Sequence, residues 1–133
     1  MPAPRVILVD DNPEFLDRAR TLLIQDFDVI ASFQDGHILL RVWSTLKPDI
    51  VISDISMPPL SGLELASRLA DQGYAGHIVF LSIHSDRDFV GAALAVGAAG
   101  YVLKSHMTSE LIPALNAVLS GKKFLSASIS HWH

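Results

Sequence analysis

The sequence predicts an α/β domain in which five short strands alternate with five helices. Two observations support this prediction. Short runs rich in valine and isoleucine recur along the chain, and each is followed by a longer stretch with apolar residues at helical spacing. The 133 residues, of which 50% are hydrophobic, are enough for one compact domain with a sizeable core. Strands that alternate with helices form parallel sheets through right-handed crossovers, so we expect helices on both faces of one sheet.

Nearly continuous apolar centres identify the strands, because the strands of a parallel sheet are buried on both faces. The predicted strands are Arg5–Asp10, Asp28–Ser32, Asp49–Asp54, His77–Ser82 and Ala99–Lys104.

Capping residues, prolines and glycines bound the predicted helices. The first helix opens at Asn12, a capping residue followed by a proline that suits the first helical position. The predicted helices run from Asn12 to about Gln25, from about Gly36 to Leu46, from near Ser61 to a point before Gly73, and from Ser85 or Asp86 to a point before Gly97. The fifth begins at Thr108, as its cap, and ends before Gly121. Residues 1–125 are therefore expected to form the domain, with 126–133 a polar tail or the start of a linker.

Composition argues against several classes of function. The absence of cysteine excludes a disulfide framework, a thiolate zinc site and a cysteine nucleophile. Ten basic against 14 acidic residues, a net charge of −4, argue against nucleic-acid binding by this segment alone. The most apolar stretch, Ala92 to Leu103, is too short to cross a bilayer, and the first apolar run is too short for a signal peptide. We therefore expect a cytoplasmic protein without a membrane partner.

Reactive side chains follow four of the five predicted strands: Asp10 and Asp11, then Asp54, Ser82 and Lys104. Ligands of open α/β sheets bind beyond the carboxyl ends of the strands, so these groups are expected in one cleft. Carboxylates that converge repel one another unless a cation relieves them, and an oxygen-only ligand set suits Mg²⁺. A carboxylate nucleophile, a divalent ion, a lysine and a hydroxyl are the groups that phosphoryl transfer requires. Helix capping would explain one aspartate, but not three beside a lysine.

Four segments together resemble the receiver domain of two-component response regulators: 6–12, 54–62, 80–82 and 97–104. The resemblance covers about residues 4–122. It implies a flavodoxin-like, doubly wound (βα)5 fold with a five-stranded parallel sheet in the order 2-1-3-4-5.

The resemblance also implies roles for the residues at the strand ends. Asp54 resembles the phosphoacceptor, which takes a phosphoryl group from a phosphohistidine of a sensor histidine kinase. Asp10, Asp11, Asp54 and the backbone carbonyl of Ser56 resemble the ligands of Mg²⁺. Lys104 resembles the catalytic lysine that pairs with the phosphoryl group.

Further implied roles concern switching and the lifetime of the phosphoryl group. Ser82 resembles both the catalytic hydroxyl and a switch residue, and Tyr101 resembles the aromatic switch that turns inward when Ser82 moves. Ser56 and His84 occupy the positions that tune phosphoryl lifetime.

The sequence departs from the usual receiver pattern at two positions. Ser105 replaces the proline that many receivers have after the lysine, which leaves open whether that peptide bond is cis. The bulky Ile83 follows Ser82, where the family usually has a small residue.

The stretch Leu111 to Leu125 is similar to receivers of the NarL/FixJ type, which continue into a LuxR-type DNA-binding domain. This similarity implies the N-terminal half of a transcriptional regulator that binds DNA only through a domain outside this chain and forms a homodimer on phosphorylation. The alternatives are a stand-alone receiver that acts by protein–protein binding and a phosphatase with an aspartate nucleophile. The phosphatase class generally requires a second aspartate where Ser56 stands, so we expect a signalling switch and not an enzyme. His131 and His133 are expected to belong to the tail and not to a metal site.

Overall fold

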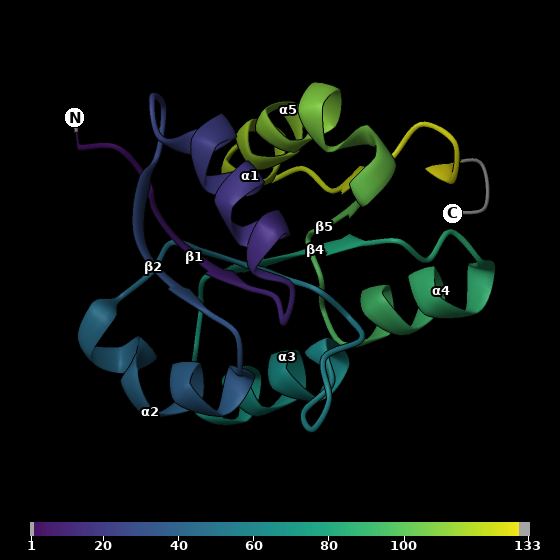
Figure 1. The fold of residues 1–133 in the computed structure, drawn as a ribbon. Helices are drawn as coiled ribbons and strands as arrows, with labels where there is room; N and C mark the ends of the chain where they lie inside the picture. Colours follow the sequence, from purple (N-terminus) through teal and green to yellow (C-terminus); the bar gives the residue numbers. More distant parts are fainter. Residues whose placement is uncertain (1, 131–133) are drawn as a thin grey trace.

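The computed structural model describes residues 2–130 and shows a parallel sheet between two layers of helices (Figure 1). The strand order is β2-β1-β3-β4-β5-β6, and every pairing is parallel. The strands are β1 (Arg5–Val9), β2 (Asp28–Phe33), β3 (Ile50–Ser53), β4 (His77–Ser82), β5 (Gly100–Leu103) and β6 (Phe124–Leu125). The helices are α1 (Pro13–Leu23), α2 (Gly36–Leu46), α3 (Gly62–Asp71), α4 (Arg87–Ala95) and α5 (Met107–Leu119), with a 3₁₀ turn over Lys104–His106.

The predicted flavodoxin-like fold and the order of its first five strands are confirmed, and one short strand is added at the edge. β6 pairs with β5 through Gly100 opposite Phe124 and Tyr101 opposite Leu125. Two residues are too few to show a strand pattern in the sequence. Their extended conformation depends instead on the free edge of β5, which only the folded sheet provides.

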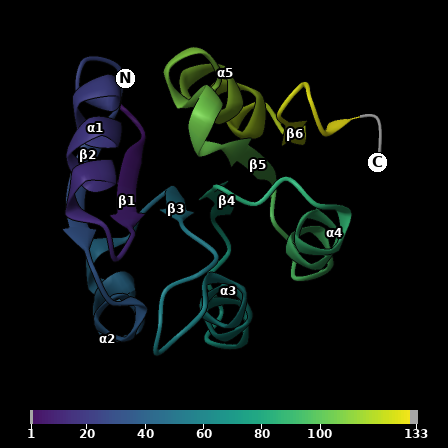
Figure 2. The ribbon, with the colours of Figure 1, turned by 45° about the vertical axis from the view of Figure 1, so that its right-hand side comes forward.

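Helices cover both faces of the sheet, as Figures 1 and 2 show: α1 and α5 lie on one face, and α2, α3 and α4 lie on the other. In β1, Val6 and Leu8 pack with the α1–α5 layer, while Ile7 and Val9 pack with the opposite layer. Successive side chains of a strand point to opposite faces. This arrangement explains the unbroken apolar runs, because both faces of the central strands are buried.

The predicted helix cap Asn12 is present, Ser61 is a further cap, and the predicted start of the fifth helix at Thr108 is corrected. The side chain of Asn12 accepts a hydrogen bond from the backbone of Glu14 at 3.0 Å, and Ser61 accepts one from Glu64 at 3.1 Å. Thr108, predicted as the cap of the fifth helix, lies inside that helix, which begins at Met107. The chain leaves β5 directly into the 3₁₀ turn, so the backbone is already helical before Thr108.

The chain continues past β6 against the domain. Ser126 and Ile129 are buried. The hydroxyl of Ser126 accepts the Leu103 N–H at 2.9 Å and donates to Oε1 of Glu110, while Oε2 of Glu110 accepts the Ala127 N–H at 3.1 Å. The domain boundary at residue 125 stays a prediction, and the tail histidines lie outside the described residues. Within residues 2–130, no helix has the length and apolar character needed to cross a membrane.

Candidate functional site

Three carboxylates meet at the carboxyl ends of two neighbouring strands. Asp10 and Asp11 follow β1, and Asp54 follows β3, which pairs directly with β1. One oxygen from each carboxylate lies within 4.8 Å of the others. Asp10 and Asp54 are buried and Asp11 is exposed. Two carboxylates of the cluster are therefore buried, and the third, that of Asp11, faces solvent.

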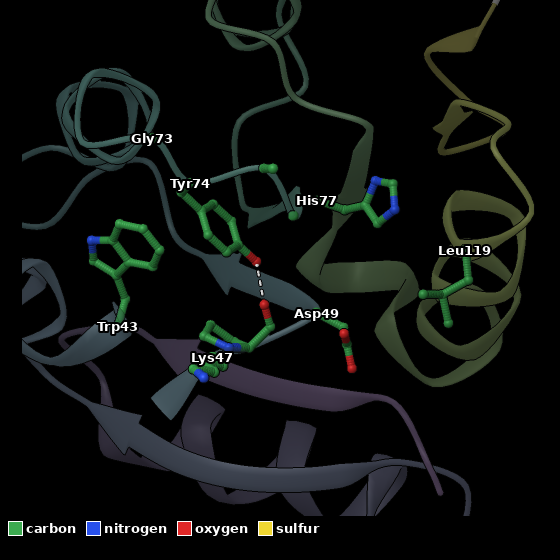
Figure 3. Close-up of a pocket in the computed structure, with 10 residues that line it drawn as sticks. Trp43, Lys47, Asp49, Gly73, Tyr74, His77 and Leu119 are labelled. Carbon is green, nitrogen blue, oxygen red and sulfur yellow. Dashed lines mark hydrogen bonds between the residues drawn. The ribbon is translucent and has the colours of Figure 1, made fainter. Parts of the chain in front are cut away.

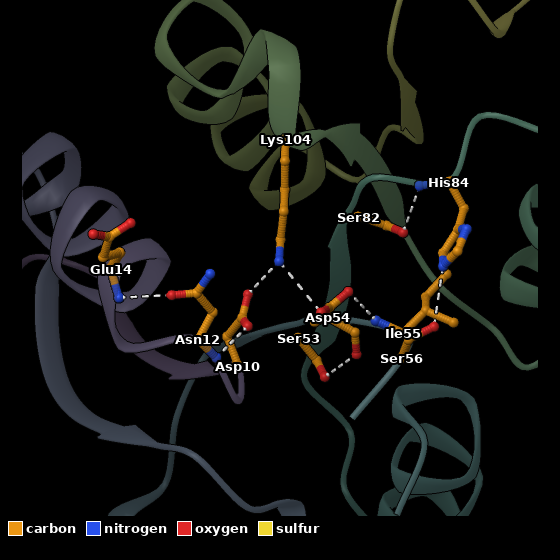
Figure 4. A network of polar contacts seen from close by, with 10 residues as sticks. All are labelled: Asp10, Asn12, Glu14, Ser53, Asp54, Ile55, Ser56, Ser82, His84 and Lys104. Atoms are coloured by element: carbon orange, nitrogen blue, oxygen red, sulfur yellow. Dashed lines mark hydrogen bonds and ion pairs between the residues drawn. The ribbon is translucent and has the colours of Figure 1, made fainter. Parts of the chain in front are cut away.

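The ammonium group of Lys104 lies between two of these carboxylates, as Figure 4 shows. Its Nζ atom is 2.7 Å from Oδ2 of Asp10 and 3.3 Å from Oδ2 of Asp54, and the lysine side chain is only 6% exposed. Burying a charge is costly unless it is paired. The lysine therefore compensates part of the negative charge that the fold concentrates here.

Burial perturbs the ionisation of Asp10. Its Oδ1 accepts the backbone N–H of Asn12 at 2.9 Å, and its Oδ2 contacts Lys104. Both contacts favour the carboxylate, but burial outweighs them and raises the pKa of Asp10 above 3.8. The folded state therefore binds the Asp10 proton more tightly than the unfolded state does.

Asp10→Asn is expected to raise the free energy of unfolding of the metal-free protein, relative to the wild type, as the pH rises from 3 to 7. Because the pKa of Asp10 is raised on folding, its contribution to stability is full below the unfolded-state pKa and is lost as the pH rises through the folded-state pKa. Asparagine does not ionise and avoids this loss. Urea unfolding at pH 7 and pH 3 measures the effect, with the exposed Asp71→Asn as the control. A difference between variant and wild type that is the same at pH 3 and pH 7 would contradict the prediction.

The backbone after β3 holds Asp54 in place. Its Oδ1 accepts the N–H of Ile55 at 2.7 Å, and the N–H of Gly62 donates to the Ile55 carbonyl at 2.7 Å. Gly62 lies so close that a Cβ atom there would come within 1.9 Å of the Asp54 carbonyl oxygen. Position 62 therefore admits only glycine unless the loop moves.

Gly62→Ala is expected to destabilise the fold by about 1–3 kcal/mol, the typical cost of overpacking. The added methyl group collides with backbone, which cannot rotate away as a flexible side chain can. Chemical denaturation of the purified variant measures the loss. Gly91→Ala in α4 is the matched control, because a Cβ there meets nothing within 4 Å and alanine favours a helix. Equal stability of the two variants would contradict this account.

Ser56, Ser82 and His84 form one hydrogen-bonded chain beside Asp54 (Figure 4). The His84 backbone N–H donates to the Ser82 hydroxyl at 3.1 Å, and His84 Nε2 lies 3.0 Å from the Ser56 hydroxyl. The imidazole ring stacks on Phe89, with a centroid distance of 4.0 Å. Sequence analysis singled out Ser56 and His84 separately. It missed their contact, because 28 residues separate them. Ile83 points outward and is 71% exposed.

Tyr101 is turned inward and fully buried. Its hydroxyl donates to the carbonyl oxygen of His84 at 2.6 Å, and burial raises its pKa. Tyr101 and Ser82 are therefore bonded to the same residue, His84.

The peptide bond between Lys104 and Ser105 is trans. Within residues 2–130, the cis bond is that between Pro58 and Pro59.

A cavity of about 530 Å³ opens at the other end of the sheet, at the amino-terminal ends of the strands (Figure 3). Trp43 and Tyr74 line it together with Lys47 and Asp49, and the Tyr74 hydroxyl donates to the Pro48 carbonyl at 3.0 Å. The aspartate cluster that follows β1 and β3 is not part of this cavity. The candidate site is the cluster of Asp10, Asp11, Asp54 and Lys104, because the reactive groups lie there and not in the cavity beside Trp43 and Tyr74.

The structure is a flavodoxin-like α/β domain with an aspartate–lysine cluster at the carboxyl ends of its strands, and comparison with known families identifies the family. The family model described as the response regulator receiver domain matches residues 6–116. The chain therefore belongs to the response regulator receiver family. Its relatives are response regulators of the LuxR/NarL type, as the resemblance implied.

Similar proteins and similar solved structures are also response regulators. The chain is 29% identical to the nitrate/nitrite response regulator NarL of Escherichia coli K12, over 94% of this chain and 59% of NarL. A LuxR-family response regulator from Aurantimonas sp. SI85-9A1 superposes with a TM-score of 0.91 at 30% identity, covering 97% of this chain and 94% of the other. The isolated receiver domain of RcsB from Salmonella enterica serovar Typhimurium, solved with the phosphomimetic BeF₃⁻, gives 0.89 at 29% identity, covering 97% of both chains. The chain spans 55% of the transcriptional regulatory protein DegU of Brevibacillus brevis and 62% of the activator EvgA of Escherichia coli K12.

Proposed function

We propose that this chain is a phosphorylation-controlled receiver that accepts a phosphoryl group on Asp54 from a sensor histidine kinase. The observation that carries the proposal is the buried ammonium of Lys104, held between Asp10 and Asp54 at the carboxyl edge of the sheet. A phosphoryl group that arrives at Asp54 would meet a positive charge already in position. Preorganised charge of this kind is a large contribution to phosphoryl transfer.

The donor set fits Mg²⁺. Asp10, Asp11 and Asp54 offer three carboxylate oxygens within 4.8 Å of one another, and hard cations prefer oxygen. The backbone carbonyl of Ser56 is the fourth ligand that we propose. When bound, the ion would neutralise charge on the phosphoryl oxygens. The exposed side of the cluster, at Asp11, leaves it open to ligands from solution.

In the proposed reaction, a carboxylate oxygen of Asp54 forms a bond to phosphorus as the phosphorus–nitrogen bond of the phosphohistidine breaks, and the nitrogen keeps that electron pair. Lys104 pairs with the phosphoryl oxygens, and the hydroxyl of Ser82 donates to one of them. The hydroxyl has one proton to donate, and its oxygen accepts from the His84 backbone, so its role toward a phosphoryl oxygen would be that of a donor.

Phosphorylation would act on the group formed by Ser82, His84 and Tyr101. A shift of Ser82 toward the phosphoryl group changes its bond with His84, whose carbonyl holds the Tyr101 hydroxyl. The added charge would thus bias the position of an aromatic side chain on β5. Ser56 and His84 would set the lifetime of the phosphoryl group, since their bonded side chains lie beside Asp54, where they would control the approach of water.

The domain context that we propose is the N-terminal half of a cytoplasmic transcriptional regulator. The curated relatives are named as transcriptional regulators, and this chain spans only part of their length. One solved RcsB structure holds two dimers of that protein on DNA. By analogy, phosphorylation would promote a homodimer, and DNA would bind through a C-terminal domain. The alternative is a stand-alone receiver that acts by binding other proteins.

The test is incubation of the purified chain with acetyl phosphate, with and without Mg²⁺, followed by intact mass measurement and peptide mapping. We expect one added phosphoryl group per chain, dependent on Mg²⁺, sensitive to hydroxylamine and located on Asp54. No labelling, or labelling of another residue, would overturn the proposal.

A further inference from the structure

We propose that Phe15 is a positioning residue for phosphoryl transfer, which holds the Lys104 ammonium through the face of its ring. This inference rests on the proposed function and names a residue that the charged cluster does not include. Phe15 lies in the first turn of α1, and Lys104 Nζ is 4.1 Å from the centroid of its ring.

The ring completes the surroundings of the ammonium group. Asp10 and Asp54 contact Nζ at 2.7 and 3.3 Å, and the phenyl ring provides a contact from α1. An aromatic ring face attracts a cation through its quadrupole, and the attraction grows when the cation is desolvated. Here the lysine side chain is only 6% exposed, which is the favourable case.

A crevice beside Phe15 has little room for water. Phe15 shares a narrow crevice with Asp10, Asp54 and apolar side chains of α1 and the sheet, and its volume is about 10 Å³. That space is close to the minimum for a single water molecule. Removing the ring would open the crevice and allow water to solvate the ammonium.

An aromatic ring suits this task better than a further acceptor would. An ammonium has three N–H donors, and a third carboxylate or carbonyl would bind one of them in a strong directional bond. A ring face attracts the charge without a lone pair. The lysine can therefore exchange its contact with Asp54 for a phosphoryl oxygen while the ring contact is retained.

The first test detects the contact without metal or phosphodonor. Ring current from Phe15 should shift the ε-methylene proton resonances of Lys104 upfield in the metal-free protein. Phe15→Leu should return them to the ordinary lysine position, and Phe15→Tyr should leave them shifted. Unshifted resonances in the wild-type protein would overturn the proposal, because the ammonium would not lie over the ring.

The second test measures phosphorylation by acetyl phosphate with Mg²⁺. Phe15→Leu should lower the rate about threefold to tenfold. Phenylalanines with one, two and three fluorine atoms at position 15 should lower it stepwise, because fluorine weakens the ring quadrupole with little change of shape. Phe15→Tyr should restore a rate close to wild type.

Two controls separate this effect from others. The same fluorinated residues at Phe27, a buried ring outside the site, should leave the rate unchanged. Arg18→Met should also leave it unchanged, since the Arg18 guanidinium lies farther from the ring centroid, at 5.3 Å. The proposal would be overturned if fluorination at position 15 did not change the phosphorylation rate, or if Arg18→Met lowered that rate as much as Phe15→Leu does. If the wild-type chain takes no label at all, the proposed function fails and this inference fails with it, whereas an effect missing only in the Phe15 series refutes this inference alone.

Discussion

Asp54→Ala is expected to abolish labelling of the chain by acetyl phosphate in the presence of Mg²⁺. The carboxylate is the proposed nucleophile, and alanine offers no oxygen to bond to phosphorus. Asp10 and Asp11 are not expected to substitute for it. Asp10 is bound to both Lys104 and the Asn12 backbone, and Asp11 is exposed to solvent. Intact mass spectrometry at several times of reaction measures the label.

The matched control is Asp71→Ala, which removes an exposed carboxylate at the end of α3. That variant should take up label at the rate of the wild-type chain. Circular dichroism should show that both variants keep the α/β fold. Stoichiometric labelling that persists in Asp54→Ala would refute the assignment of the phosphoacceptor.

Lys104→Met is expected to slow phosphorylation about 100- to 1,000-fold, the usual cost of removing one preorganised charge-stabilising group. Methionine is similar in length to the lysine stem but carries no charge. The growing negative charge on the phosphoryl group would then lose its partner, and Asp10 and Asp54 would lose the cation that lies between them. Initial rates with acetyl phosphate at saturating Mg²⁺ measure the loss.

Lys122→Met is the matched control, because this lysine is exposed and belongs to the turn after α5. Its rate should equal that of the wild-type chain. The free energy of unfolding of Lys104→Met should be measured as well, since removing one partner of a buried ion pair is destabilising. A folded Lys104→Met protein that is phosphorylated at the wild-type rate would show that the lysine has no role in transfer.

The residues at the strand ends show how much of the site could be predicted. The centres of the strand runs Arg5–Asp10 and Asp49–Asp54 are apolar because both faces are buried, so the ends of these runs are visible as charged residues. Parallel strands place their carboxyl ends at one edge, which makes convergence predictable from connectivity. The structure places Asp10, Asp11, Asp54 and Lys104 together as expected.

Other features gave no signal in the sequence. β6 is two residues long and exists because β5 has a free edge. The bond between Ser56 and His84 joins the loops that follow β3 and β4, which lie side by side only because these two strands pair in the sheet. The contact of Phe15 with Lys104 depends on the rotation of α1 about its axis, which neighbouring side chains decide.

Local and connectivity rules therefore determine the class of fold, the edge at which the site lies and the kinds of reactive group present. They are sufficient because burial periodicity and the parallel crossover depend on short stretches of chain. The partner of each group was decided only by tertiary packing. Distances of 2.7 Å for Lys104 to Asp10, 3.0 Å for Ser56 to His84 and 4.1 Å for Lys104 to Phe15 arise from elements far apart in the chain. Such contacts depend on how side chains interdigitate in a close-packed interior, which no local pattern records.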